Sequence, residues 1–292
     1  MSNENKSVEN NAGPLEEGQE WYIGGHDRQM SEKEQLEQLG SYIDAHYELP
    51  DFQPPWAGGG SPEADNYCAK LPDRITHAAM LVLGSGVDHS LPGVVYTDQI
   101  EVRDTEAGQV FVPPEPTGKW AVSLHSGGWW RGSGQALEMQ WRPEVAAAAQ
   151  LSGTTIIDVD YPLAPEHTVA DMVAAVQQAV DYAKAQGAKS VTLWGYSSGA
   201  ALAALVPADA YVLTFPDFGA LANLPDELRA GYEVPGELSN ALVQTATEDE
   251  IAEPVTLTDS ATYEEYVARH RISTPAVARQ RIRATAEYLR SV

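Results

Sequence analysis

Residues 191–204 decide the fold, and their sequence is VTLWGYSSGAALAA. A short β-forming run (191–194) leads into the motif GYSSG (195–199), and small helix-forming residues (200–204) follow. Such a strand–turn–helix unit holds Ser197 at a sharp turn, where flanking glycines let the chain pass close to its neighbours. The N-terminus of the helix would point its N–H groups at negative charge developing beside the serine. The pattern G-x-S-x-G alone is weak in a chain with 24 glycines, but its place between strand and helix predicts a nucleophilic Ser197.

The chain after about residue 90 alternates between β-rich and helical runs. Strands are predicted at 99–103, 108–112, 120–125, 154–160, 190–194, 210–215, 241–246 and 255–258. Helices are predicted at 135–150, at 168–186 and from Thr274 onward. This alternation predicts an α/β fold whose mostly parallel, eight-stranded sheet carries helices on both faces. The short link between the first two strands predicts an antiparallel hairpin.

Two of these helices carry clear end signals. Thr168 and Asp171 form a capping-box pattern at the start of 168–186, and Gly187 follows its last turn. Thr274 followed by Pro275 is typical of the start of a helix, because proline is tolerated at the first helical position.

Two further motifs follow predicted strands. The motif HSGGWW (125–130) offers glycine N–H groups where a tetrahedral oxyanion would need donors, although a tight turn alone would also explain it. The motif DVDYPLAPEH (158–167) suggests no catalytic step, and we interpret it as a structural turn whose carboxylates satisfy backbone donors.

Along the chain, HSGGWW comes first, DVDYPLAPEH second and GYSSG third. Motifs of these kinds in this order resemble the hormone-sensitive-lipase-like branch of the α/β-hydrolase fold. The resemblance covers roughly residues 90–292 and is strongest over 125–204. It implies a carboxylesterase-type serine hydrolase that forms an acyl-enzyme. It also implies an oxyanion hole made by the N–H groups of Gly127, Gly128 and Ser198. The chain departs from the family pattern at Ser126, where glycine is usual, and at Pro162, where arginine is usual.

The expected organisation has three parts. Residues 1–20 are polar and acidic, and we expect a disordered tail. Residues 21–90 would form an N-terminal cap or extension that contains a helix at 31–47, followed by a loop at 50–62. Residues 91–292 would form the α/β-hydrolase catalytic domain.

A nucleophilic serine requires a base, and the base requires an acid that orients it. In this fold the chain order is serine, acid, histidine, and His270 is the only histidine after Ser197. Asp249 is the favoured acid because it follows the strand at 241–246, as in the family. Asp217 is the second choice, and Glu248 and Glu250 stay open because they adjoin Asp249. The 21 residues from Asp249 to His270 are too few for the helix that the family normally carries there.

The expected substrate is a small neutral carboxylic ester, on the analogy with the family. Trp129 and Trp130 are candidate substrate-binding residues, although aromatic core packing explains either one equally well. The segment 219–239 and the helix at 31–47 are candidates to cover the site. An acyltransferase or peptidase using the same triad, or a non-catalytic module with a hydrolase fold, are the alternatives.

Composition limits the partners. The chain has 42 Asp and Glu against 18 Lys and Arg, a formal net charge of -24, which disfavours nucleic acid and anionic membranes. We expect no cofactor and no metal, because His and Cys show no ligand spacing and Cys68 is the single cysteine. The N-terminal residues lack a secretory pattern, so a cytoplasmic protein is expected. A homodimer could form through a sheet edge near Val255 and the last helix.

The arginines are unevenly placed along the chain. Six of the 12 lie between Arg269 and Arg290, on both sides of the proposed base and along the last helix. A solvated helix face explains such a run, and a local positive patch beside the active site is the functional alternative.

Overall fold

The structure is a computed structural model that describes residues 30–84, 86–93, 99–257 and 261–292. Its centre is an eight-stranded sheet in the order β1-β2-β4-β3-β5-β6-β7-β8. β1 and β2 form an antiparallel hairpin, β2 pairs antiparallel with β4, and the remaining pairs are parallel. The α/β fold, the mostly parallel sheet and the hairpin predicted from the sequence are therefore confirmed.

The strands are β1 Glu101–Thr105, β2 Gly108–Val112, β3 Trp120–Leu124, β4 Thr155–Val159, β5 Val191–Tyr196, β6 Ala210–Thr214, β7 Ala241–Ala246 and β8 Ala261–Tyr266. The α-helices are α1 Glu32–His46, α2 Glu63–Val82, α3 Arg142–Ser152, α4 Val169–Ala185, α5 Ser198–Ala204, α6 Phe218–Ala222, α7 Asp226–Arg229 and α8 Pro275–Ser291. A short 3-10 helix η1 (Pro55–Ala57) precedes α2, and a π-helix η3 (Leu137–Trp141) runs directly into α3.

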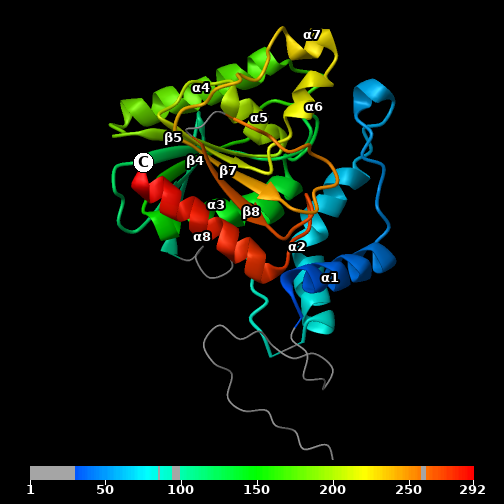
Figure 1. Cartoon of the computed structure of the whole chain (residues 1–292). Helices are drawn as coiled ribbons and strands as arrows, with labels where there is room; N and C mark the ends of the chain where they lie inside the picture. Colours follow the sequence, from blue (N-terminus) through cyan, green and yellow to red (C-terminus); the bar gives the residue numbers. More distant parts are fainter. Residues whose placement is uncertain (1–29, 85, 94–98, 258–260) are drawn as a thin grey trace, which may run out of the picture.

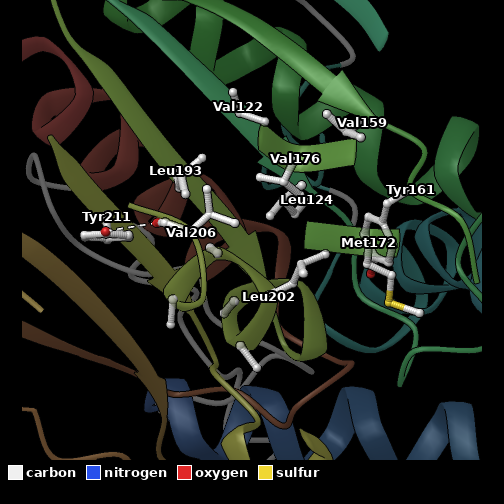
Figure 2. Close-up of a cluster of buried hydrophobic side chains, with 14 of the residues drawn as sticks. Val122, Leu124, Val159, Tyr161, Met172, Val176, Leu193, Leu202, Val206 and Tyr211 are labelled. Carbon is white, nitrogen blue, oxygen red and sulfur yellow. Dashed lines mark hydrogen bonds between the residues drawn. The ribbon is translucent and has the colours of Figure 1, made fainter. Parts of the chain in front are cut away.

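Helices cover both faces of the sheet (Figure 1). α4 and α5 pack on one face, where Val122, Val159 and Leu193 of the strands meet Val176 and Leu202 of the helices (Figure 2). α3 and α8 pack on the other face, against the strand residues that point the opposite way: Ala121, Ile156, Trp194, Val212 and Leu242. Side chains alternate between faces along a strand, so a sheet buried on both sides needs nearly continuous apolar strands.

The helix predictions agree with the structure in most places. Thr168 caps α4 and accepts a hydrogen bond from Asp171 N–H in a capping box, and Thr274 caps α8 in front of Pro275. The helix predicted at 31–47 is α1, which Ser31 caps. The predicted tail at 1–20 lies outside the described residues.

The last strand was predicted in the wrong place. Residues 255–257 form no strand, and Thr258 lies outside the described residues; the eighth strand is β8, which pairs with β7 from Ala241↔Ala261 to Ala246↔Tyr266. Instead, the backbone N–H and C=O of Leu257 hydrogen-bond the Tyr263 hydroxyl. β8 is an edge strand with mostly exposed side chains, so it lacks the apolar pattern that signals a buried strand. The sheet edge expected near Val255 is likewise misplaced.

α2 was not predicted from the sequence, because its internal Pro72 and mixed composition hide the helical pattern. α2 packs against α1, and together they bury an apolar cluster that includes Leu36, Leu39 and Leu71. In the described stretch from 247 to 257, no helix lies between β7 and β8, as the short interval predicted.

Candidate active site

The loops after β3, β5, β7 and β8 meet at one edge of the sheet. Parallel neighbours place Leu124 opposite Gly195, and Ala246 opposite Tyr266, so these strands end side by side. The carboxyl ends of parallel strands form the usual ligand-binding edge of an open α/β sheet. The predicted site residues follow these four strand ends.

Ser197 lies between β5 and α5 in a strained backbone conformation. Its φ is 57° and its ψ is -119°, a region that residues other than glycine rarely adopt. A Cβ on Gly195 would lie 2.2 Å from the carbonyl oxygen of Gly199, and one on Gly199 would lie 2.4 Å from the carbonyl oxygens of Leu124 and His125. Both glycines of the motif are therefore required by close packing, which is what the sequence predicted.

His270 connects Ser197 to Asp249. His270 Nε2 lies 2.8 Å from Ser197 Oγ, and His270 Nδ1 lies 2.8 Å from Asp249 Oδ2. The side chain of His270 is 4% exposed and that of Asp249 is 11% exposed, so the chain of hydrogen bonds is largely shielded from water. With Nδ1–H donating to the carboxylate, Nε2 is free to accept the serine proton.

Asp249 is the carboxylate that contacts the base. Its Oδ1 accepts hydrogen bonds from the backbone N–H groups of Ile251 and Ala252. Burial raises the pKa of Asp249, but the hydrogen bond and charge of His270 together with these two N–H groups outweigh it and hold the pKa below its usual value. Asp249 therefore stays ionised beside the imidazole.

The other candidate acids have different partners. Asp217 caps α6, its Oδ1 accepts a hydrogen bond from Ala220 N–H, and burial raises its pKa. Glu248 pairs with Lys33 at 2.8 Å on the surface. Glu250 Oε2 accepts a hydrogen bond from the backbone N–H of His270 at 3.0 Å, so it holds the base loop without touching the imidazole.

The proposed oxyanion loop turns sharply beside Ser197. Gly127 and Gly128 have φ values of +146° and +61°, and a Cβ on Gly127 would lie 1.7 Å from the carbonyl oxygen of Arg131. Within the described residues, the N–H groups of Gly127 and Ser198 donate to no acceptor. The N–H of Gly128 donates to Ser198 Oγ at 2.9 Å. Two of the three predicted donors are therefore free, and the third is engaged by a hydroxyl.

His125 and Tyr161 hold this loop from behind. Their rings stack with centroids 4.2 Å apart, the Tyr161 hydroxyl donates to His125 O at 2.8 Å, and His125 Nδ1 lies 2.7 Å from Ser126 O. Burial lowers the pKa of His125 to about 4, so its imidazole is neutral at pH 7. Tyr161 belongs to the DVDYPLAPEH motif, in which Asp158 is also buried and hydrogen-bonded to Ser123 and Arg142.

A cavity of about 400 Å³ contains Ser197 and His270. Both predicted substrate-binding residues line it, although Trp129 is fully buried and also packs into the core beneath α4 and α5. Its other walls come from η1, from α2 and from the loop after β6. The lining residues include Phe52, Trp56, Cys68, Arg131, Asp217, Asn223 and Arg271. The segment 219–239 thus contributes to the cavity through Ala220 and Asn223.

Several residues around the site were not singled out from the sequence. The Tyr196 hydroxyl donates to His270 O, which ties the turn at residues 195–199, called the elbow below, to the loop that carries His270. Arg131 and Arg271 line the cavity, and each guanidinium lies close to the Phe52 ring. The position of Arg131 directly after HSGGWW and of Arg271 directly after His270 was a signal that could have identified them.

Comparisons with known proteins agree with the resemblance seen in the motifs. Residues 121–213 match the model of a family described as having the alpha/beta hydrolase fold. No curated protein is a significant match. The family match and the sheet topology show that the chain has the α/β-hydrolase fold, and the solved structures below support the same assignment.

The similar solved structures are distant in sequence. A hormone-sensitive lipase from a metagenome library aligns with TM-score 0.57 and 15% identity, over 91% of this chain and 99% of that chain. An esterase of the bacterial hormone-sensitive lipase family aligns with TM-score 0.55 and 17% identity, over 89% and 99%. A hyperthermophilic esterase from the archaeon Pyrobaculum calidifontis aligns with TM-score 0.51 and 18% identity, over 78% and 90%.

In residues 30–84, 86–93, 99–257 and 261–292, no three His, Cys, Asp or Glu side chains are grouped so that they could hold a metal ion. Over the same ranges, no helix is both long enough and apolar enough to cross a bilayer.

Proposed function

We propose that this chain is a carboxylesterase-type serine hydrolase that cleaves a small carboxylic ester through an acyl-enzyme. The observation that carries the proposal is the continuous chain of two 2.8 Å contacts from Ser197 Oγ through His270 to Asp249 Oδ2. The esterases among the similar solved structures support the same reaction class.

The cycle has two halves. His270 Nε2 accepts the Ser197 proton as Oγ attacks the ester carbonyl carbon, and Asp249 stabilises the imidazolium that forms. The N–H groups of Gly127 and Ser198 lie free to donate to the oxyanion, and that of Gly128 can join them if it exchanges Ser198 Oγ for the oxyanion. His270 then protonates the leaving alcohol. A water molecule, deprotonated by His270, releases the acid from Ser197.

Hydrolysis of a p-nitrophenyl ester by the wild type and by Ser197→Ala tests this proposal. The variant should lose at least about 10³-fold in kcat while its circular dichroism and thermal melting stay unchanged. Ser291→Ala, an exposed serine near the C-terminus, is the matched control and should keep full activity. Unchanged hydrolysis by a folded Ser197→Ala variant would contradict the proposal, and an inactive wild type would favour a non-catalytic module.

Acyl transfer by the same triad differs only in the molecule that attacks the acyl-enzyme. Adding an alcohol such as methanol to the assay and measuring the methyl ester by chromatography separates the two. Hydrolysis predicts free acid as the main product at low alcohol concentration.

A further inference from the structure

Two arginines line the cavity that contains Ser197. Arg131 follows the oxyanion loop and is 9% exposed, and Arg271 follows His270 and is half-buried. Their guanidinium carbons lie 4.8 Å and 3.9 Å from the centre of the Phe52 ring. Two positive charges are thus placed on one aromatic ring inside the proposed active site.

Neither guanidinium has a carboxylate partner in the described part of the chain. Arg131 Nη1 donates to Cys68 Sγ at 3.3 Å, which is a weak acceptor, and no hydrogen bond from the Arg271 side chain to a described residue is present. Other arginines of the protein are paired: Arg142 with Asp158, Arg269 with Asp44, and Arg281 with Glu144. Buried or half-buried charges usually have a partner. Among the described residues, the half-buried Arg74 also lacks a carboxylate, but it lies over the rings of Tyr47 and Tyr67 and does not line this cavity.

Asp65 interacts electrostatically with Arg131, and Glu250 with Arg271, but both carboxylates are hydrogen-bonded to other groups. Asp65 Oδ1 accepts a hydrogen bond from Gly132 N–H, and Glu250 Oε2 accepts one from His270 N–H. Burial and then the charge of Arg131 lower the pKa of Arg271 by more than nearby groups, Glu250 among them, raise it, so the two cations repel each other. An anion placed between them would remove that repulsion.

We propose that Arg131 and Arg271 bind a carboxylate carried by the substrate, so that the ester cleaved at Ser197 is an anionic one. This inference rests on the proposed function and replaces the neutral ester expected from the sequence. Guanidinium groups match carboxylates in shape and donate two parallel hydrogen bonds to them. The net charge of -24 repels anions elsewhere on the protein, so the attraction must come from these two local groups.

The test uses two pairs of esters that differ only by a charge. Monophenyl glutarate and the phenyl ester of glutaramic acid carry the carboxylate or its amide on the acyl side. 4-Acetoxybenzoate and 4-acetoxybenzamide carry them on the alcohol side. For each pair the ratio of kcat/KM, anionic over neutral, is measured by chromatography of the released phenol, after subtraction of the uncatalysed rate.

Four variants are compared with the wild type. Arg271→Gln and Arg131→Gln each remove one cation from the cavity, and Arg271→Lys keeps the charge without the planar fork. Arg283→Gln is the matched control, because Arg283 is exposed on α8 and does not line the cavity, yet its loss changes the net charge equally. Thermal melting of each variant verifies folding, and Arg271→Gln carries the test if the more buried Arg131 variant does not fold.

The wild type should prefer the anionic member of at least one pair. Arg271→Gln should lower that ratio by about tenfold to a hundredfold, Arg271→Lys should lower it less, and Arg283→Gln should leave it within about twofold. This inference would be overturned if Ser197 is needed to hydrolyse the neutral esters but Arg271→Gln leaves the anionic-to-neutral ratios unchanged. That result would leave the proposed function intact. Absence of Ser197-dependent hydrolysis of all four esters would overturn both.

Discussion

The two sides of the proposed active site are built in different ways. On one side, Ser197 directly follows β5, whose neighbours β3 and β6 are buried in the centre of the sheet. On the other side, Phe52, Arg131 and Arg271 form a wall held by contacts with the N-terminal helices rather than by the sheet. The sheet therefore fixes where the proposed chemistry happens, whereas the wall can select a substrate without altering the fold.

The largest effect should come from the acid on the sheet side. Asp249→Asn removes the charge that orients and stabilises the His270 imidazolium, so kcat should fall by about 10³- to 10⁴-fold. Asp217→Asn is the matched comparison, since Asp217 also lines the cavity but binds Ala220 N–H. It should lower kcat by less than about tenfold. Equal losses in the two variants, measured by ester hydrolysis, would show that Asp249 is not the orienting acid.

A second expected effect is on stability at the elbow. The Cβ of Gly199→Ala would lie 2.4 Å from the backbone carbonyl oxygens of Leu124 and His125, which cannot move without disturbing β3. Urea unfolding should show a loss of about 3 kcal/mol. Gly236→Ala adds its Cβ to open space and should change the free energy of unfolding by less than about 0.5 kcal/mol. A Gly199→Ala protein as stable as the wild type would mean that the elbow is loosely packed.

A third effect concerns pH and the buried His125 behind the oxyanion loop. Its pKa is lowered to about 4 in the folded state by burial, against 6.5 when unfolded. The unfolded chain therefore takes up a proton first as pH falls, and the stability due to neutral His125 is lost between about pH 6.5 and 4. Between pH 7 and pH 5, the free energy of unfolding of the wild type should fall by about 2 kcal/mol more than that of His125→Gln. Parallel stability curves of the two proteins would contradict this.

The smallest effect should come from the wall side. Asp65 of α2 accepts a hydrogen bond from Gly132 N–H at 2.9 Å and so links the N-terminal helices to the loop that carries Arg131. Asp65→Ala should lower kcat/KM by about tenfold, which corresponds to about 1.4 kcal/mol. Asp65→Asn keeps an acceptor oxygen and should lose less. If both variants match the wild type, α2 does not position this loop.

The contrast between the sheet side and the wall side also explains which features could be predicted from the sequence. The strand–turn–helix unit around Ser197, the HSGGWW loop and the capped helix α4 depend on local signals, so the sheet was predicted correctly and Ser197 was placed at the turn between β5 and α5. β8 was misplaced because an exposed edge strand carries no apolar pattern, and α2 was missed because Pro72 interrupts its signal. The cavity wall joins Phe52, Arg131 and Arg271, which are far apart in the chain. The two arginines adjoin predicted site motifs, but no local pattern reports their contacts with Phe52.

His270 and Asp249 could be predicted less directly than Ser197 but more directly than the cavity wall. Chain order alone indicated His270. The strand predicted at 241–246 favoured Asp249, which follows it, but four carboxylates remained possible for the acid. Only the packed structure separates them, because Asp249 contacts the imidazole while Asp217, Glu248 and Glu250 bind other groups.

The most direct test of the account is covalent labelling of the nucleophile. A fluorophosphonate probe reacts with a serine only when a base activates that serine and an oxyanion hole is in place. Labelling therefore reports on the nucleophile, the base and the oxyanion hole together. The account predicts that one probe molecule attaches per chain, that peptide mass spectrometry places it on Ser197, and that Ser197→Ala abolishes labelling. A folded wild-type protein that stays unlabelled, or that carries the probe on another residue, would contradict it.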